Sequence, residues 1–133
     1  MISKYCLNHV MNAAFVQNGG SFYIGLSSSA PTSSGTNYSE PSGNGYARVK
    51  VENFTMLSDG VVTNRDTLAF PLTTGTWFSA DARAAYWCLF DGSGSNANML
   101  ASGSLNTPRT IEEGVVITVP AGALNISLVE MES

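Results

Sequence analysis

The side chains that could support nucleophilic or metal chemistry are few and widely spaced in this chain. A nucleophilic Ser or Cys needs a His to take its proton and a carboxylate to orient that His. The single histidine, His9, falls in a segment with helical periodicity, where such a residue usually lies on a surface or at an interface. Cys6 and Cys88 match no metal or redox spacing. We therefore expect two buried free thiols, with a bridge between them as the alternative, and no metal or other cofactor.

The acidic residues do not form a recognisable catalytic pair. A glycoside hydrolase needs two carboxylates about 5 to 9.5 Å apart. The spacing of the acids near expected loops and strand ends singles out no pair among Glu40, Glu52, Asp81 and Asp91. Gly92, Gly94 and Gly103 precede expected strands, whereas a phosphate-binding loop precedes a helix. We predict that the chain is not an enzyme, and a polysaccharide-cleaving enzyme is the weakest alternative.

Aromatic residues near loops leave a carbohydrate-binding surface as an open alternative. A flat ring can stack on a sugar while Asn, Asp or Ser side chains bond its hydroxyls. Trp77 follows the Thr73-Thr74-Gly75 turn and is the best candidate, although a Trp that caps the end of the core is the more common case. The candidate contact residues for a glycan are Tyr38, Trp77, Asp91 and Asn96.

Composition narrows the class of protein further. The 133 residues fit a single domain, 1–133, with only 12% charged residues against roughly 25% in ordinary soluble domains. The net charge is −4 and Lys and Arg do not cluster, which disfavours a nucleic-acid partner. No apolar run approaches the roughly 18 residues of a membrane span, and the N-terminus lacks signal-peptide features. We expect synthesis in the cytoplasm and no membrane insertion.

The periodicity of apolar residues predicts an all-β domain preceded by one helix. Residues 2–16 repeat apolar side chains at three- and four-residue steps, and residues 21–129 change to a period of two. Short runs with frequent turn signals predict an antiparallel β-sandwich of the jelly-roll kind with seven to nine strands. Long polar loops are expected at 27–45 and 92–98. The expected strands lie around 22–26, 47–52, 61–63, 68–70, 75–79, 84–91, 99–105, 115–119 and 124–128.

The strand at 84–91 has apolar residues on both faces. Tyr86, Cys88 and Phe90 alternate there with Ala85, Trp87 and Leu89. Such a strand should be central in its sheet and covered on both sides, or covered on one side by another subunit. The candidate residues for an oligomer interface are Tyr5 and Val10 on the helix and Trp87 and Leu89 on this strand.

The segment 40–49 combines turn residues with a possible ion pair. Pro41 favours an extended backbone, and Gly43 and Gly45 allow a tight turn before the next strand. Arg48 falls on the polar face of that strand. It could pair with Glu40 or Asp81, or remain solvated.

Several stretches, taken in order, resemble a family of small phage tail-fibre-like proteins. The most distinctive is Glu-Pro-Ser-Gly-Asn-Gly-Tyr-Ala-Arg-Val at 40–49. The resemblance extends over nearly the whole chain. The other matching stretches are Phe22–Ser27 with Ala30-Pro31-Thr32 and Gly35-Thr36-Asn37, Asn64-Arg65-Asp66 with Leu68–Pro71 and Trp77, Trp87–Asp91, Leu100–Leu105, Thr107–Thr110 and Pro120–Leu124.

The resemblance implies a structural protein of a bacteriophage or prophage virion, either a tail fibre or another tail-associated component, made in the host cytoplasm. We expect a homo-oligomer that contacts other virion proteins, and a trimer in particular because fibre tips are commonly threefold. The alternatives are a carbohydrate- or receptor-binding module that contacts a host-surface glycan, and a head decoration protein.

Overall fold

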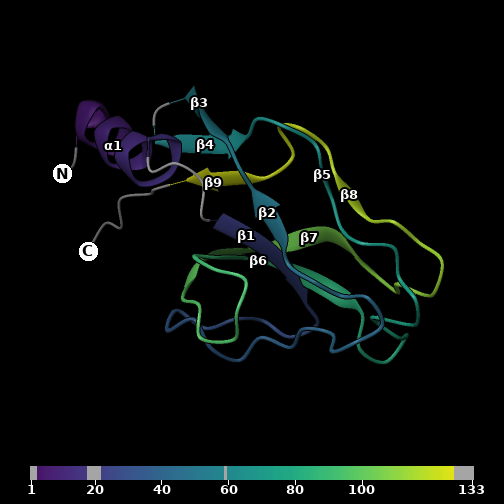
Figure 1. Cartoon of the computed structure of the whole chain (residues 1–133). Coiled ribbons are helices and arrows are strands. Elements are labelled where there is room, and N and C mark those ends of the chain that lie inside the picture. Colours follow the sequence, from purple (N-terminus) through teal and green to yellow (C-terminus); the bar gives the residue numbers. More distant parts are fainter. Residues whose placement is uncertain (1–2, 18–21, 59, 128–133) are drawn as a thin grey trace. The chain divides into compact units, whose positions relative to one another are not determined.

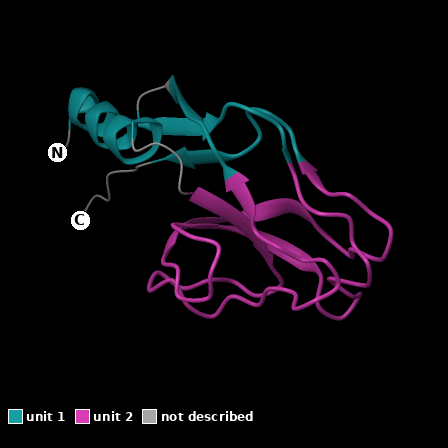
Figure 2. Ribbon diagram, in the orientation of Figure 1, with its two compact units in different colours: residues 1–21, 51–68, 119–133 teal, residues 22–50, 69–118 magenta. Residues whose placement is uncertain are grey.

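The computed structural model describes residues 3–17, 22–58 and 60–127, which form a short N-terminal helix and nine strands (Figure 1). The described chain divides into two compact units (Figure 2). Unit 1 comprises residues 1–21, 51–68 and 119–133, and unit 2 comprises residues 22–50 and 69–118. Each unit is therefore assembled from segments that are distant in sequence. The prediction of a single domain stays a prediction.

The helix of unit 1 begins and ends close to where the periodicity places it. α1 (Lys4–Met11) starts at Ser3, whose Oγ accepts a hydrogen bond from the Cys6 N–H at 3.1 Å, and it continues as a π-helical turn, η1 (Asn12–Val16). Ile2, the first expected residue, lies outside the described residues. No helix in the described ranges is long and apolar enough to cross a membrane.

The buried face of the helix differs from the one that the sequence predicted. Met11 is buried, and Phe15 meets the ring of Phe54 edge-on at 5.4 Å. Cys6 and Val10 are exposed. The prediction that Cys6 is buried is therefore wrong: the three- and four-residue steps fit two adjacent faces of the helix, and packing selected the face with the larger side chains.

The helix packs in unit 1 on a three-stranded antiparallel sheet of order β3-β4-β9 (Figure 1). β3 (Phe54–Ser58) was not predicted, since its residues show no strict alternation of apolar and polar side chains. β4 (Val61–Asn64) and β9 (Asn125–Ser127) match expected strands. The Asn8 side-chain oxygen accepts a hydrogen bond from Gly60 N–H at 2.7 Å, which joins the helix to the β3–β4 connection.

The sheet of unit 2 has the order β2-β1-β6-β7. β6 is internal, as predicted, and its register pairs Trp87 with Leu26 on one side and with Gly103 on the other. Leu89 and Phe90 are fully buried, whereas Trp87 remains half-buried. The strands are β1 (Phe22–Ser27), β2 (Val49–Val51), β6 (Ala84–Phe90) and β7 (Met99–Arg109).

The remaining strands are short. β5 (Leu68–Ala69) and β8 (Thr118–Val119) form a two-stranded sheet. The strand expected at 75–79 is reduced to a single bridge between Phe78 and Ile111, because the neighbouring backbone follows turns. The all-β class with antiparallel strands and one short helix is confirmed. The arrangement is compatible with a sandwich, and the jelly-roll connectivity stays a prediction.

Candidate functional site

A buried ion pair organises the long loop of unit 2. Arg48 Nη2 lies 2.7 Å from Glu40 Oε1, and Arg48 Nε donates to Glu40 Oε2 at 3.1 Å. Only 6% of the Arg48 side chain and 14% of the Glu40 side chain are exposed. The sequence left three possibilities for Arg48, which were a pair with Glu40, a pair with Asp81, or solvation. In the structure Arg48 pairs with Glu40. The fork of the guanidinium matches the two carboxylate oxygens, which makes this geometry strong and directional.

Tyr46 completes this charged cluster, which comprises Glu40, Tyr46 and Arg48. Its hydroxyl donates to Glu40 Oε2 at 2.5 Å and accepts from the Leu26 N–H at 3.1 Å. Burial, and then the hydrogen bond to Glu40, raises the pKa of Tyr46 far above its ordinary range. For Arg48, burial opposes the charge but the bond to Glu40 outweighs it, so the pKa of Arg48 is also raised.

Gly25 explains how the charged cluster fits against the sheet. A Cβ built at this position of β1 would lie 2.6 Å from Glu40 Oε2 and 2.8 Å from the Tyr46 hydroxyl. Both contacts are too short for a real Cβ. A glycine in the middle of a strand often marks a close approach of this kind. Gly25 thus provides the space in which the loop's polar groups reach the strand.

Arg48 also joins the two long polar loops. Its Nη1 donates to the carbonyl oxygens of Gly92 at 3.2 Å and Gly94 at 2.9 Å. Its guanidinium lies 3.5 Å from the centre of the Phe90 ring, which Tyr38 meets edge-on at 5.2 Å. One side chain therefore holds the 28–48 loop and the 91–98 loop together on the same sheet.

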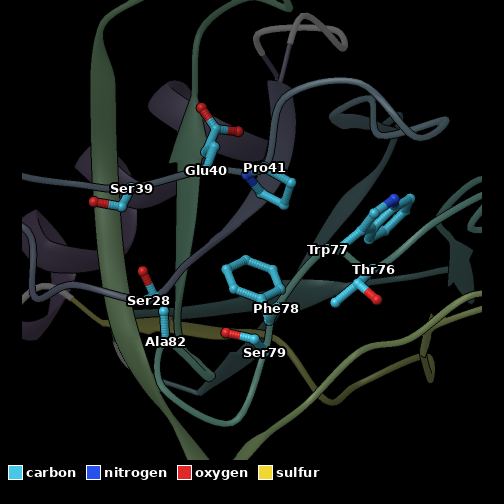
Figure 3. A pocket seen from close by; sticks show the side chains of 9 residues that line it. All are labelled: Ser28, Ser39, Glu40, Pro41, Thr76, Trp77, Phe78, Ser79 and Ala82. Atoms are coloured by element: carbon cyan, nitrogen blue, oxygen red, sulfur yellow. The ribbon is translucent and has the colours of Figure 1, made fainter.

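A shallow pocket of about 270 Å³ lies beside this cluster in unit 2 (Figure 3). Figure 3 shows hydroxyl groups and apolar side chains around the same hollow. Its lining carboxylate, Glu40, is already engaged by Arg48 and Tyr46. The pocket can therefore offer neutral hydrogen-bonding groups but no free carboxylate. The lining residues are Ser28, Ser39, Glu40, Pro41, Thr76, Trp77, Phe78, Ser79 and Ala82.

The candidate glycan-contact residues fall in two places. Tyr38 and Asp91 belong to the loops that Arg48 joins, and Asn96 is exposed in the second of these loops. Asp91 accepts hydrogen bonds from the backbone and side-chain nitrogens of Asn98 at 2.7 and 3.1 Å, so it closes its own loop. Trp77 instead lines the pocket.

Trp77 has little surface to offer a ligand. It is only 6% exposed, and its indole N–H donates to the Asn44 carbonyl oxygen at 2.8 Å. Its ring meets Tyr46 edge-on at 5.1 Å. Trp77 therefore caps the core of unit 2, which is the more common place for a Trp of this kind.

The candidate interface residues differ greatly in exposure. Tyr5 is 80% exposed and Val10 is 45% exposed on α1. Trp87 is half-buried on β6, with its indole directly over Gly103. Leu89 is fully buried within the chain, so we leave it out of any proposed interface. Sequence reasoning missed the exposed apolar side chains of Leu57, Leu72, Leu100, Val115 and Val116.

The buried thiol of Cys88 is not activated as a nucleophile. Cys88 is buried as predicted, and burial followed by the nearby Glu40 charge raises the pKa of its thiol to about 12. Such a thiol stays protonated and unreactive at neutral pH. Across the described ranges, no group of three or more His, Cys, Asp or Glu residues is placed to hold a metal ion.

Comparison with known proteins agrees with the motifs in the sequence. The family model described as "Podophage GP4 fiber I protein gp80" matches residues 1–127. No match is found among the curated proteins. The match spans both units and includes the 40–49 segment that carries Glu40, Tyr46 and Arg48. The chain therefore belongs to this family of structural fibre proteins of bacteriophages.

Proposed function

We propose that this chain acts in the virion by associating with copies of itself and by surface contact, without catalysis. The observation that carries the proposal is the second apolar face of the N-terminal helix. One face buries Met11 in unit 1, while Tyr5, Cys6, Val10 and Ala13 are exposed on the other side. Large exposed apolar side chains on a short helix favour burial against another chain.

The charge of the chain permits such an association. Only 12% of the residues are charged and the net charge is −4, so like-charge repulsion between copies is small. We propose three copies, in keeping with the threefold symmetry common in fibres. The helix would meet its symmetry mates around the axis, and other virion proteins would hold the assembly in the particle.

The solution mass tests this proposal directly. Light scattering on a size-exclusion column should give a stable mass of three or more chains at micromolar concentration. The variant Val10→Glu should lower that mass, because it places a charge in the proposed interface. The matched control Ser95→Glu adds the same charge to an exposed loop residue and should leave the mass unchanged. A monomeric wild-type chain would overturn the proposal.

A second candidate function is supported by the pocket and the joined loops. The hydroxyl groups of Ser28, Ser39, Thr76 and Ser79 line a neutral hollow beside the charged cluster. Such a surface suits the hydroxyls of a neutral host-surface glycan better than an ionic ligand. Retention on immobilised host polysaccharide should fall for Ser79→Tyr, which fills the hollow, and should persist for Ser93→Tyr. Equal retention of both variants would exclude this site.

A further inference from the structure

Among the strands that the structure describes, β7 is a long one that lies at the edge of its sheet. It runs over 11 residues, Met99–Arg109, and is the last strand in the sheet order β2-β1-β6-β7. β6 pairs with one side of β7, and no other described strand pairs with the opposite side. The described backbone hydrogen bonds outside the strands and helices do not involve residues 99–109. Its outer N–H and C=O groups therefore form a row that another strand could bond.

Two of the devices that normally protect such an edge, charge and proline, are absent from most of β7. Proteins protect edge strands with charged side chains, proline, bulges or a covering segment. From Met99 to Thr107 the strand has no charged residue and no proline. Pro108 and Arg109 are confined to its end. The pairing with β6 shifts register between Ala84 and Tyr86 and between Leu89 and Phe90, so the regular part of this edge is Ala101–Ser104. A regular, uncharged edge stretch of this kind favours pairing with another strand.

The middle of β7 has room for a close neighbour. Ala101, Ser102, Gly103 and Ser104 carry small side chains or none, and Gly103 is the midpoint of the uncharged run 99–107. The indole of Trp87 lies against Gly103, where a Cβ would be 2.6 Å from the ring. Trp87 is half-buried, so apolar surface remains beside the edge at this point.

From this edge, and resting on the proposed self-association, we infer that β7 pairs antiparallel with β7 of a second copy about a twofold axis at Gly103. An antiparallel copy of the same edge is complementary to it by symmetry, since each donor of one strand meets an acceptor of the other. The uncharged run 99–107 neither repels its own copy nor offers a charge pattern to a different partner. The contact joins two four-stranded sheets into one continuous sheet.

This contact is distinct from the one proposed for the helix and has its own stoichiometry. Twofold pairing alone yields a dimer, and pairing of two helix-mediated trimers yields a hexamer. The register places Ser102 of one copy directly opposite Ser104 of the other, on the same face of the sheet. Both serines are exposed, so substitutions there should change pairing without disturbing the core.

Light scattering of the full chain tests the inference with a pair of charge variants. Wild type should contain an even number of chains. In the double variant Ser102→Lys with Ser104→Lys, each new lysine of one copy would lie opposite a lysine of the other. The repulsion should break the β7 contact and halve the mass. The double variant Ser102→Lys with Ser104→Glu sets opposite charges across the same positions and should keep the wild-type mass. Unchanged far-ultraviolet circular dichroism would show that each variant is folded.

The control Ser93→Lys with Ser95→Lys adds the same charge outside the edge and should keep the wild-type mass. A stable wild-type trimer, or a double-lysine variant of wild-type mass, would overturn the β7 contact and leave the proposed self-association standing. Loss of pairing in the Lys/Glu variant would overturn the Gly103-centred contact. A wild-type monomer would overturn both proposals.

Discussion

Each unit of this protein holds its loops with a polar cluster, but the two clusters use different chemistry. In unit 1 the neutral amide of Asn64, which is 1% exposed, accepts from the Leu124 N–H at 2.9 Å and donates to the carbonyl oxygens of Asp66 and Pro120 at 2.8 and 3.0 Å. In unit 2 the charged pair of Glu40 and Arg48 holds the loops, with Arg48 donating to the carbonyl oxygens of Gly92 and Gly94. Both satisfy backbone groups of segments that lack regular hydrogen bonding.

The difference between the clusters lies in what remains when one partner is lost. Removal of the Asn64 side chain leaves neutral backbone groups without partners. Removal of Arg48 leaves the Glu40 carboxylate, with 14% of its side chain exposed, without its counterion. An uncompensated buried charge is more costly than an unpaired neutral group. The charged cluster should therefore be the more sensitive of the two to substitution.

The largest effect is expected for Arg48→Ala. Loss of the counterion, together with the bonds to Gly92 and Gly94, should lower the free energy of unfolding by about 3–5 kcal/mol. Urea denaturation followed by fluorescence measures this change. The double variant Glu40→Gln with Arg48→Met removes both charges and should be less destabilised than Arg48→Ala. If the double variant is the less stable, the buried charge is not the reason for the sensitivity of unit 2.

Asn64→Ala should have the next largest effect. The Leu124 N–H and two carbonyl oxygens lose their partner, and each unsatisfied buried group costs about 1–3 kcal/mol, less where water can enter. We expect a total loss below that of Arg48→Ala in the same urea experiment. A loss larger than that of Arg48→Ala would reverse the comparison.

Gly25→Ala should cost about 1–3 kcal/mol, as overpacking of a full interior usually does. The added Cβ meets Glu40 Oε2 and the Tyr46 hydroxyl, so one of these groups must move. Combining Gly25→Ala with Tyr46→Phe removes one of the two clashing atoms and should reduce the additional cost of the alanine. Gly94→Ala is the matched control, because a Cβ there meets nothing within 4 Å. Equal losses for Gly25→Ala and Gly94→Ala would contradict the packing argument.

Alkaline pH should affect unit 2 through Cys88. The pKa of its thiol is raised from 9.0 to about 12 in the folded chain. Below pH 9 both states keep the proton, so stability is unaffected. Above that pH the unfolded chain releases its proton while the folded chain retains it, and the free energy of unfolding falls by up to about 1.4 kcal/mol per pH unit. Denaturation at pH 8, 9 and 10 measures this slope.

Cys88→Ala is the control for the alkaline effect. It should be less stable than wild type at pH 8, but its free energy of unfolding should fall less than that of wild type between pH 9 and 10. Tyr46, whose pKa is also raised, contributes only above its ordinary value of 10.0. An identical slope in wild type and Cys88→Ala would show that the buried thiol does not control the pH dependence.

The folding of particular segments could be predicted from local pattern alone. The N-terminal helix followed from its apolar steps, and β1 and β6 followed from alternation and from apolar residues on both faces. The Glu40–Arg48 pair was one of three alternatives, because a spacing of eight residues does not decide whether a loop folds back. β3 was missed, since its strand conformation depends on pairing with β4 and not on its own pattern.

The sequence by itself determined the all-β class, the central strand, the weakly charged surface and the fibre family, because these depend on periodicity, composition and ordered motifs. Tertiary structure alone decided which face of the helix is buried, that Trp77 caps a core, and that Arg48 binds two loop carbonyl groups 44 and 46 residues away in sequence. It also left β7 at the edge of its sheet. These features arise from contacts between distant segments, and no local pattern specifies which segments will meet.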